Sequence, residues 1–265
     1  MYPLVYERAG SLAEAVDLLE RTGGRPLAGG QSLVSAMKLR LADVGTVVDL
    51  GGIPGLRGIR REGDSLVIGA MTRHADVAES PVVQATLPGL ARLAAGIGDR
   101  QVRNMGTVGG ALANNDPAAC YPAAVLALGA TVHTTKRVIA AEQFFVGIYQ
   151  TALDDGELIT EVRFPLPTAA AYAKFEQPAS QFALVGVFVA KTAAGVRVAV
   201  TGAKACVYRC TEIETALAAS FTPAAARGVQ VSADELSADL HASAEYRAHL
   251  IPVMAARAVA QATGG

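Results

Sequence analysis

Two glycine-containing segments of similar design constrain this chain more than any other feature of its sequence. Residues 28–32 are Ala-Gly-Gly-Gln-Ser and residues 107–111 are Thr-Val-Gly-Gly-Ala, and each follows a short apolar, strand-like segment. Glycine permits a left-handed backbone and lets the chain approach a ligand closely, so the amides of such a loop can form a cradle for an anion. A helix predicted directly after the first loop adds the positive end of its dipole. Two cradles of this kind suit a diphosphate.

The pattern around the first loop predicts an α/β unit. Residues 11–24 begin with Ser11, carry Glu14 three positions later and end at two glycines, which is typical of a capped helix. A short strand then enters the glycine turn, followed by a helix over 33–41 and a strand over 46–50. The predicted order is therefore strand, glycine loop, helix, strand.

The rest of the chain alternates between helices and strands, with one break. Further strands are expected over 65–70, 130–135 and 157–167, and further helices over 72–80, over 81–98 with an interruption near Pro88, and over 117–129. Prolines and small residues make 165–171 the best domain boundary. Beyond it, the segments AYAKFEQPA, FALVGVFVA and VRVAVTGA predict three antiparallel strands, followed by helices around 211–219 and 242–262.

Composition excludes several classes of protein. The 265 residues suffice for one large or two modest domains. Apolar runs such as FALVGVFVA are far shorter than the ~20 residues needed to span a bilayer, and the N-terminus lacks a secretory pattern, so a cytoplasmic location is expected. With 23 basic and 24 acidic residues the net charge is −1, and no basic block is dense enough for a nucleic-acid partner.

The cysteines, histidines and short motifs narrow the chemistry further. Cys120, Cys206 and Cys210 have no spacing typical of a disulfide framework or a metal site, so they are expected in the core or near the surface. His74 and His133 are expected to be surface or capping residues. The spacings of a P-loop and of a Rossmann dinucleotide site are absent. From the residues alone, the two glycine loops remain either anion cradles or plain turns.

Three segments in the same order resemble one known family. Residues 28–50, 97–130 and 156–165 closely resemble the medium, FAD-binding subunit of the molybdenum hydroxylases, the family of carbon monoxide dehydrogenase, xanthine dehydrogenase and dehydrogenases of N-heterocycles such as nicotine and caffeine. Residues 241–250, HASAEYRAHL, also resemble the usual ending of these subunits. The likeness extends from one end of the chain to the other.

The resemblance implies an α+β fold in two domains. Residues 1–168 would form an FAD-binding domain of the vanillyl-alcohol-oxidase (PCMH) type, in which two α/β subdomains grip the cofactor. Residues 169–265 would form a C-terminal domain of the carbon monoxide dehydrogenase flavoprotein type, with a three-stranded antiparallel sheet and helices.

The resemblance also implies a set of FAD-binding residues. Two loops would hold the diphosphate: Ala28, Gly29, Gly30, Gln31, Ser32 and Leu33 in the first, and Thr107, Val108, Gly109, Gly110 and Ala111 in the second. Asp116, in the family's Asp-Pro-Ala segment, would reach the sugar or the flavin. Ile97, Ile159 and Lys174 match single positions that line FAD in relatives, although Lys174 alone is equally compatible with an exposed strand lysine.

The chain departs from the family pattern at two places. Cys120 stands where members often carry aspartate, and Gln181-Phe182 stands where members carry an acidic–aromatic pair. Phe182 could cover a flavin face but lacks a phenol hydroxyl, so contacts of Cys120 and Phe182 with FAD stay open. No cysteine-rich insertion is present, which excludes the additional iron–sulfur cluster of one branch of the family.

The family likeness implies electron transfer rather than substrate chemistry. The chain would bind FAD and pass electrons from iron–sulfur clusters to an external acceptor, with no catalytic residue and no metal site of its own. A large subunit would hold the molybdenum cofactor and a small subunit two 2Fe–2S clusters, in a dimer of heterotrimers. A self-contained FAD-dependent oxidoreductase and a binding module that has lost FAD are the rivals, and the substrate and the final acceptor are not specified by the sequence.

Overall fold

The N-terminal part of the chain is a small parallel sheet with two helices. In the computed structural model, which describes residues 1–264, the strand order is β1-β3-β2 and both pairings are parallel. The elements are β1 (Val5–Arg8), α1 (Leu12–Thr22), β2 (Arg25–Leu27), α2 (Leu33–Lys38) and β3 (Thr46–Asp49). This confirms the predicted order of strand, glycine loop, helix and strand.

The boundaries of α1 follow from its caps. The Ser11 hydroxyl accepts a hydrogen bond from the amide of Glu14 at 3.2 Å, while the Glu14 carboxylate accepts one from the amide of Gly10 at 2.7 Å. At the other end Gly23 adopts φ +61°, and its amide donates to Leu19, as expected for a left-handed cap. The helix predicted over 11–24 is therefore confirmed.

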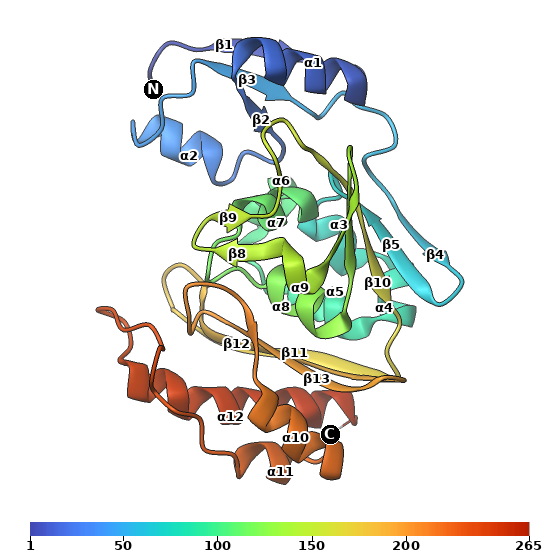
Figure 1. Ribbon diagram of the computed structural model, residues 1–265, viewed down its shortest axis with the longest axis vertical. Helices are drawn as coiled ribbons and strands as arrows, with labels where there is room; N and C mark the ends of the chain where they lie inside the picture. Colours follow the sequence, from blue (N-terminus) through green and yellow to red (C-terminus); the bar gives the residue numbers. More distant parts are fainter. Residues whose placement is uncertain (265) are drawn as a thin grey trace.

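The middle of the molecule is a five-stranded antiparallel sheet covered by short helices (Figure 1). Its strands, in the order β4-β5-β10-β6-β7, are β4 (Ile59–Glu62), β5 (Ser65–Gly69), β10 (Ile159–Pro165), β6 (Thr131–Thr134) and β7 (Val138–Ala140). The helices are α3 (His74–Glu79), α4 (Pro81–Thr86), α5 (Pro88–Ala95), α6 (Arg100–Met105), α7 (Val108–Asn114), α8 (Tyr121–Leu128) and α9 (Ala141–Phe144). A small hairpin, β8 (Phe145–Gly147) with β9 (Gln150–Thr151), completes this part.

Two predictions about these helices are confirmed. The expected interruption near Pro88 separates α4 from α5. The expected buried helix is α8, in which every residue from Tyr121 to Leu128 is buried. It begins four residues later than the predicted segment 117–129, because residues 117–120 form a turn.

The C-terminal sheet has four strands rather than the three predicted. Its antiparallel order is β11-β12-β13-β14, with β11 (Ala169–Glu176), β12 (Ala183–Thr192), β13 (Gly195–Thr201) and β14 (Tyr208–Arg209). The sequence did not indicate β14 because two residues are too few to show strand periodicity. Three helices follow: α10 (Thr211–Ala219), α11 (Pro223–Arg227) and α12 (Ala244–Ala262).

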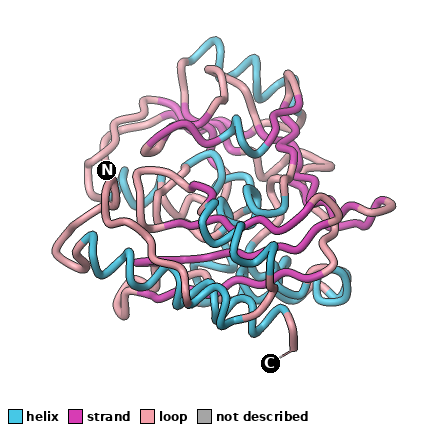
Figure 2. The backbone as a smooth tube through the Cα atoms, turned by 60° about the horizontal axis from the view of Figure 1, so that its bottom comes forward, coloured by secondary structure: helices cyan, strands magenta, loops and turns pink. Residues whose placement is uncertain are grey.

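The C-terminal sheet is buried on both faces. Phe188 and Ala190 of β12 join the core formed with α5 and α8, whereas Val187 and Val189 join a second core with α12. Figure 2 shows the helices of this part lying across the strands. Burial on both faces explains why FALVGVFVA is apolar throughout instead of alternating. The sheet is thus shared between two cores.

Residues 1–264 lack two features that would point to other kinds of function. Within residues 1–264, no helix combines the length and apolar character needed to cross a membrane. In the same residues, no group of three or more His, Cys, Asp or Glu side chains is arranged to hold a metal ion.

Candidate cofactor site

The first glycine loop leaves β2 and enters α2. Gly30 has φ +72°, a conformation that L side chains rarely adopt, and a Cβ built there would lie 2.9 Å from Cγ2 of Val34. Gly30 is therefore required for the turn itself. The sequence predicted a helix over 33–41, but α2 has only six residues, so its dipole adds little. The anion-binding capacity of this loop rests on its amides.

The amides of this loop are open. Among the described residues, the backbone N–H groups of Gly29, Gly30, Gln31 and Ser32 donate to no protein acceptor. The Ser32 hydroxyl forms no capping hydrogen bond and is exposed. Consecutive unpaired amides next to a small hydroxyl residue can bind the oxygens of a phosphate group. The prediction of a cradle fits the first loop well.

The second glycine loop is built differently from the prediction. Thr107 is the N-cap of α7, and its hydroxyl accepts a hydrogen bond from the amide of Gly110 at 3.2 Å. The amides of Val108 and Gly109 donate to the carbonyls of Thr72 and Ala70 at 3.0 and 2.8 Å. Two amides that were expected to face a ligand therefore fix the start of α7 to the segment after β5, and the amide of Gly110 bonds to the helix cap.

Glycine at 109 is needed for packing. A Cβ at Gly109 would lie 2.6 Å from the Cβ of Ala70 and 2.9 Å from its carbonyl oxygen. Gly110 is less tightly enclosed, because its nearest neighbours would be the Thr107 hydroxyl at 2.8 Å and Ala28 Cβ at 3.5 Å. Gly109 is thus a structural glycine, whereas Gly110 faces the first loop.

The two loops, distant in sequence, meet in the structure. A Cβ at Gly29 would overlap the carbonyl oxygen of Met105 and would lie 2.7 Å from its carbonyl carbon and 2.8 Å from Gly106 Cα. Together with the approach of Ala28 to Gly110, this contact joins the first loop to the turn between α6 and α7. The junction places open amides of one loop beside the small residues of the other.

Asp116 lies just beyond α7 and is held by its neighbours. Its carboxylate accepts hydrogen bonds from the amide of Ala118 at 2.8 Å and from the hydroxyl of Tyr149 at 3.4 Å. Asn115, which the sequence analysis missed, ends α7 with φ 42°. Its side-chain amide donates to the carbonyls of Gly147 and Gln150 at 2.8 and 2.7 Å. Asn115 therefore fastens the β8–β9 hairpin beside Asp116.

Lys174 is not an exposed strand lysine. Its side chain is 9% exposed, and its ammonium donates to the carbonyls of Gly96 and Gln181 at 2.6 and 2.5 Å. Ile97 follows Gly96 and is half-buried, so Lys174 positions the segment that carries Ile97. Ile159 is buried at the start of β10. The carbonyl of the next residue, Thr160, accepts a hydrogen bond from the amide of Ala70. Because the carbonyl of Ala70 accepts one from the amide of Gly109, this contact links β10 to the second loop.

Known proteins resemble this chain over nearly its whole length. Residues 2–167 match the family described as the FAD binding domain in molybdopterin dehydrogenase. The chain is 36% identical to the nicotine 6-hydroxylase medium subunit of Paenarthrobacter nicotinovorans, over 97% of this chain and 96% of that protein. It is 38% identical to the carbon monoxide dehydrogenase medium chain of Hydrogenophaga pseudoflava, over 96% and 95%.

Solved structures give the same result. A structure of carbon monoxide dehydrogenase from Hydrogenophaga pseudoflava contains a chain with TM-score 0.90 and 36% identity, covering 100% of this chain and 99% of that one. The chain belongs to the FAD-binding medium subunits of the molybdenum hydroxylases. Quinoline 2-oxidoreductase from Pseudomonas putida 86 also contains a similar chain, with TM-score 0.89 and 26% identity over 100% and 98%.

One cavity of this medium subunit is lined by two residues that the family likeness relates to FAD. Asp116 and Phe182 both line a cavity of about 390 Å³, which Tyr149, Gln177, Lys204 and Arg247 also border. Phe182 is 49% exposed at this position. The cavity therefore joins Asp116, after α7, to Phe182, at the start of β12.

Cys120 is buried behind that region, in agreement with its expected place in the core. It is 6% exposed, and burial raises the pKa of its thiol. The Tyr172 hydroxyl, which lies near Cys120, is buried and has no hydrogen-bond partner within residues 1–264. The Cys120 thiol thus lies near the Tyr172 hydroxyl, which lacks an acceptor, and near the cationic Lys174.

We expect the Cys120→Asp variant to fold and to bind FAD at least as tightly as the native chain. The new carboxylate would accept from the Tyr172 hydroxyl and would lie near the Lys174 ammonium, so its burial is compensated. The control is Ala124→Asp, which places an unpaired carboxylate inside the fully buried α8 and should destabilise the fold by about 3 kcal/mol. Thermal unfolding and FAD titration measure both effects. Insoluble Cys120→Asp protein would contradict the expectation.

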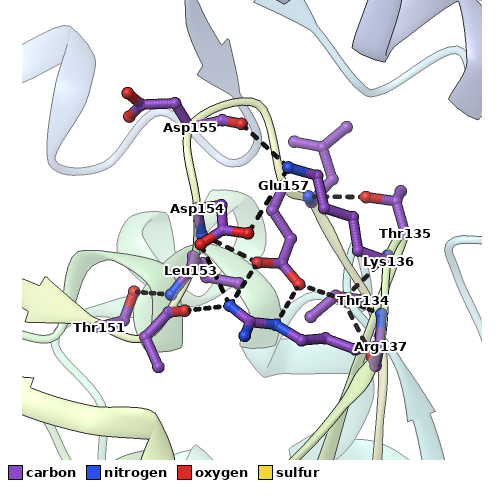
Figure 3. Close-up of polar contacts among 11 residues, drawn as sticks. Thr134, Thr135, Lys136, Arg137, Thr151, Leu153, Asp154, Asp155 and Glu157 are labelled. Atoms are coloured by element: carbon purple, nitrogen blue, oxygen red, sulfur yellow. Dashed lines mark hydrogen bonds and ion pairs between the residues drawn. The ribbon is translucent and has the colours of Figure 1, made fainter.

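An ionic network around the buried Glu157 carboxylate supports the segment before Ile159 (Figure 3). The Glu157 carboxylate is fully buried and accepts hydrogen bonds from the Thr134 hydroxyl at 2.6 Å, the Asp154 amide at 2.9 Å and the Arg137 guanidinium at 3.1 Å. Leu158 belongs to the N-terminal core, whereas Ile159 belongs to the middle one. Glu157 thus holds the segment that joins the two cores.

We expect Glu157→Gln to remove an acid-sensitive part of the stability. Burial alone would raise the pKa of Glu157, but the hydrogen bonds from Arg137, Asp154 and Thr134 outweigh it and lower the pKa to about 2. Because the folded pKa lies below the unfolded value near 4.5, the contribution is complete above pH 4.5 and is lost as pH falls towards 2. At pH 7 the variant should lose up to about 3 kcal/mol.

Urea unfolding at a series of pH values measures this effect. The control Glu79→Gln changes an exposed carboxylate at the end of α3 and should leave the unfolding free energy unchanged. A Glu157→Gln variant with native stability at pH 7 would show that the neutral amide satisfies the same partners.

Proposed function

We propose that this medium subunit holds one FAD with its diphosphate at the junction of the two glycine loops and passes electrons from iron–sulfur clusters of a small subunit to an external acceptor. The observation that carries the proposal is the contact of Gly29 with the Met105–Gly106 turn, which sets four open amides beside the small residues of the second loop. The chemistry of these donors suits an anionic group.

Each residue of the site has a distinct role in this proposal. The amides of Gly29 through Ser32 bind phosphate oxygens, and Ala28 and Leu33 complete the loop. Gly110 and Ala111 leave space for the diphosphate, while Thr107, Val108 and Gly109 fix the turn. Ile97 and Ile159 form apolar walls, Lys174 positions Ile97, and Asp116 reaches the sugar or the flavin.

The finer architecture is also part of the proposal. Residues 1–168 form the FAD-binding domain of the PCMH type and residues 169–265 the C-terminal domain; the family match that ends at residue 167 supports this division. The complex is a dimer of heterotrimers in the cytoplasm. The relatives are named as medium subunits or medium chains, which supports a large, molybdenum-bearing subunit and a small, iron–sulfur subunit as partners.

The redox chemistry belongs to the cofactor, and the residues of this chain bind and orient it. When bound, FAD accepts and donates electrons. The loop amides would hold its central diphosphate, and the cavity between Asp116 and Phe182 would receive its flavin. The residues of this chain bind and orient the cofactor, and hydroxylation of the substrate belongs to the molybdenum-bearing subunit.

An absorption spectrum of the purified chain tests the proposal. Flavin bands with one FAD per chain are expected, and acid extraction should release FAD rather than FMN, because the diphosphate is the group that the loops recognise. A colourless chain that binds no added FAD would instead support a binding module that has lost its cofactor.

A further inference from the structure

His74 lies beneath the turn that joins the two loops. It was expected to be a surface or capping residue, but it is the first residue of α3, after the Arg73 cap, and is only 4% exposed. Its amide donates to the carbonyl of Gly106 at 3.0 Å. Its Nε2 atom lies 2.6 Å from the position that a Cβ on Gly106 would occupy, so glycine at 106 makes room for the imidazole.

The same turn contacts the first loop on another side. Gly106 Cα lies 2.8 Å from the position of a Cβ on Gly29. The start of α3 is fastened to this turn a second time, because the amide of Val108 donates to the carbonyl of Thr72 at 3.0 Å. The turn is therefore held between the His74 ring and the loop whose amides are open.

We propose that His74 is a positioning residue for FAD: its neutral imidazole supports the Met105–Thr107 turn against the first loop, and protonation of the ring weakens FAD binding. This inference rests on the proposed function, because it assigns the diphosphate to that junction. His74 itself does not contact the cofactor in this arrangement.

The surroundings of the ring favour its neutral form. Arg103 of α6 is the cation that acts on it, and the ring of Tyr121 lies 5.3 Å away between centroids. On its own helix, the Asp76 carboxylate accepts from the amide of Arg73, and Glu79 is exposed.

The other elements that pack against α3 add no carboxylate. The α4 helix carries no titratable side chain, α5 carries only the exposed Arg92, and α6 carries the exposed Arg100 besides Arg103. Nδ1 of His74 has no hydrogen-bond partner among the described residues. A second proton on the ring would thus have neither an acceptor nor a counter-charge.

The sign of the pH effect follows from this environment. Burial, assisted by Arg103, lowers the pKa of His74 to about 4, below its ordinary value of 6.5. When the turn opens, the pKa of the released His74 ring returns towards 6.5. As pH falls from about 6.5 towards 4, the open states therefore bind protons more readily than the closed turn. FAD binds only to the closed turn in this proposal, so its dissociation constant rises over this range to the extent that the FAD-free chain populates the released state.

Fluorescence titration of the full chain with FAD between pH 4.5 and 8 tests the proposal. We expect the dissociation constant of the native chain to rise from pH 7 to pH 5, by about twentyfold at most. His74→Phe, which keeps a ring but cannot be protonated, should show a flat profile. The matched control His133→Phe changes a half-buried histidine on β6 and should follow the native chain.

A second measurement keeps the proposal testable if His74→Phe does not fold. Calorimetry of FAD binding at pH 5.5, in buffers of different ionisation enthalpy, should show protons released on binding. A flat native profile, tighter binding at acid pH, no proton release, or a His74→Phe profile that parallels the native one would overturn the role of His74. Failure of the native chain to bind FAD at any pH would instead overturn the proposed function.

Discussion

Replacement of Gly29 by alanine should abolish FAD retention while leaving most of the fold intact. The added methyl group would meet the backbone of Met105 and Gly106, where its nearest carbon neighbours lie 2.7 and 2.8 Å away. Contacts this short with main-chain atoms force the two loops apart, because no side-chain rotation relieves them. The large cores lie elsewhere, around α8 and α12, so secondary structure should persist.

The measurement is the ratio of flavin to protein absorbance after purification, with circular dichroism as a check on folding. Gly30→Val should act in the same direction, because a side chain at φ +72° costs about 1–2 kcal/mol and the branched group fills the cradle. Gly110→Val should weaken retention by filling the space near Ala28. The control is Gly228→Ala, at φ −73° with no neighbour nearer than 3.5 Å, which should behave as the native chain.

Full flavin occupancy in the Gly29→Ala variant would contradict the assignment of the diphosphate to this junction. Loss of secondary structure in the same variant would instead make Gly29 a folding determinant, and Gly30→Val would then decide the assignment.

The sequence predicted the elements around the site but not how the second loop uses its amides. Ser11 with Glu14, the glycine turn before α2 and the break at Pro88 are local signals, and the structure has an element boundary at each. The bonds of Val108 and Gly109 to Thr72 and Ala70 depend on a segment about forty residues earlier in the chain. Nothing in TVGGA itself distinguishes an amide that faces a ligand from one that faces β5.

The sequence pattern also did not predict which polar residues are buried, because their burial depends on distant segments. His74 was expected to be a surface or capping residue, yet it is buried, and Gly106, from a distant segment, provides the space for its ring. Lys174 was left undecided, and its ammonium is fixed by the carbonyls of Gly96 and Gln181 from two other segments. The sequence could have predicted Asn115 as the end of a helix, because asparagine tolerates the left-handed conformation that ends α7.

The second prediction with a large expected effect concerns which subunits supply the electrons that reduce the flavin. The purified chain should bind one FAD and gain about 2.7 kcal/mol of stability at a hundredfold excess of FAD over the dissociation constant. Its flavin should not be reduced when an N-heterocycle, an aldehyde or carbon monoxide is added alone, because in this family hydroxylation belongs to the molybdenum-bearing subunit. Addition of the substrate together with the large and small subunits should bleach the flavin absorbance.

The decisive comparison uses the same substrate with the chain alone, with the small subunit only, and with both partners. Bleaching only in the last mixture is expected, since electrons must pass from the large subunit through the small one. The mouth of the cavity carries exposed Ile148, Tyr149 and Phe182 rather than charges of one sign, so the rate should depend only weakly on salt. Rapid bleaching by a substrate with the chain alone would refute the subunit function and favour a self-contained flavoenzyme, in which the Tyr149 hydroxyl, 3.4 Å from the Asp116 carboxylate, would be the first acid–base pair to test.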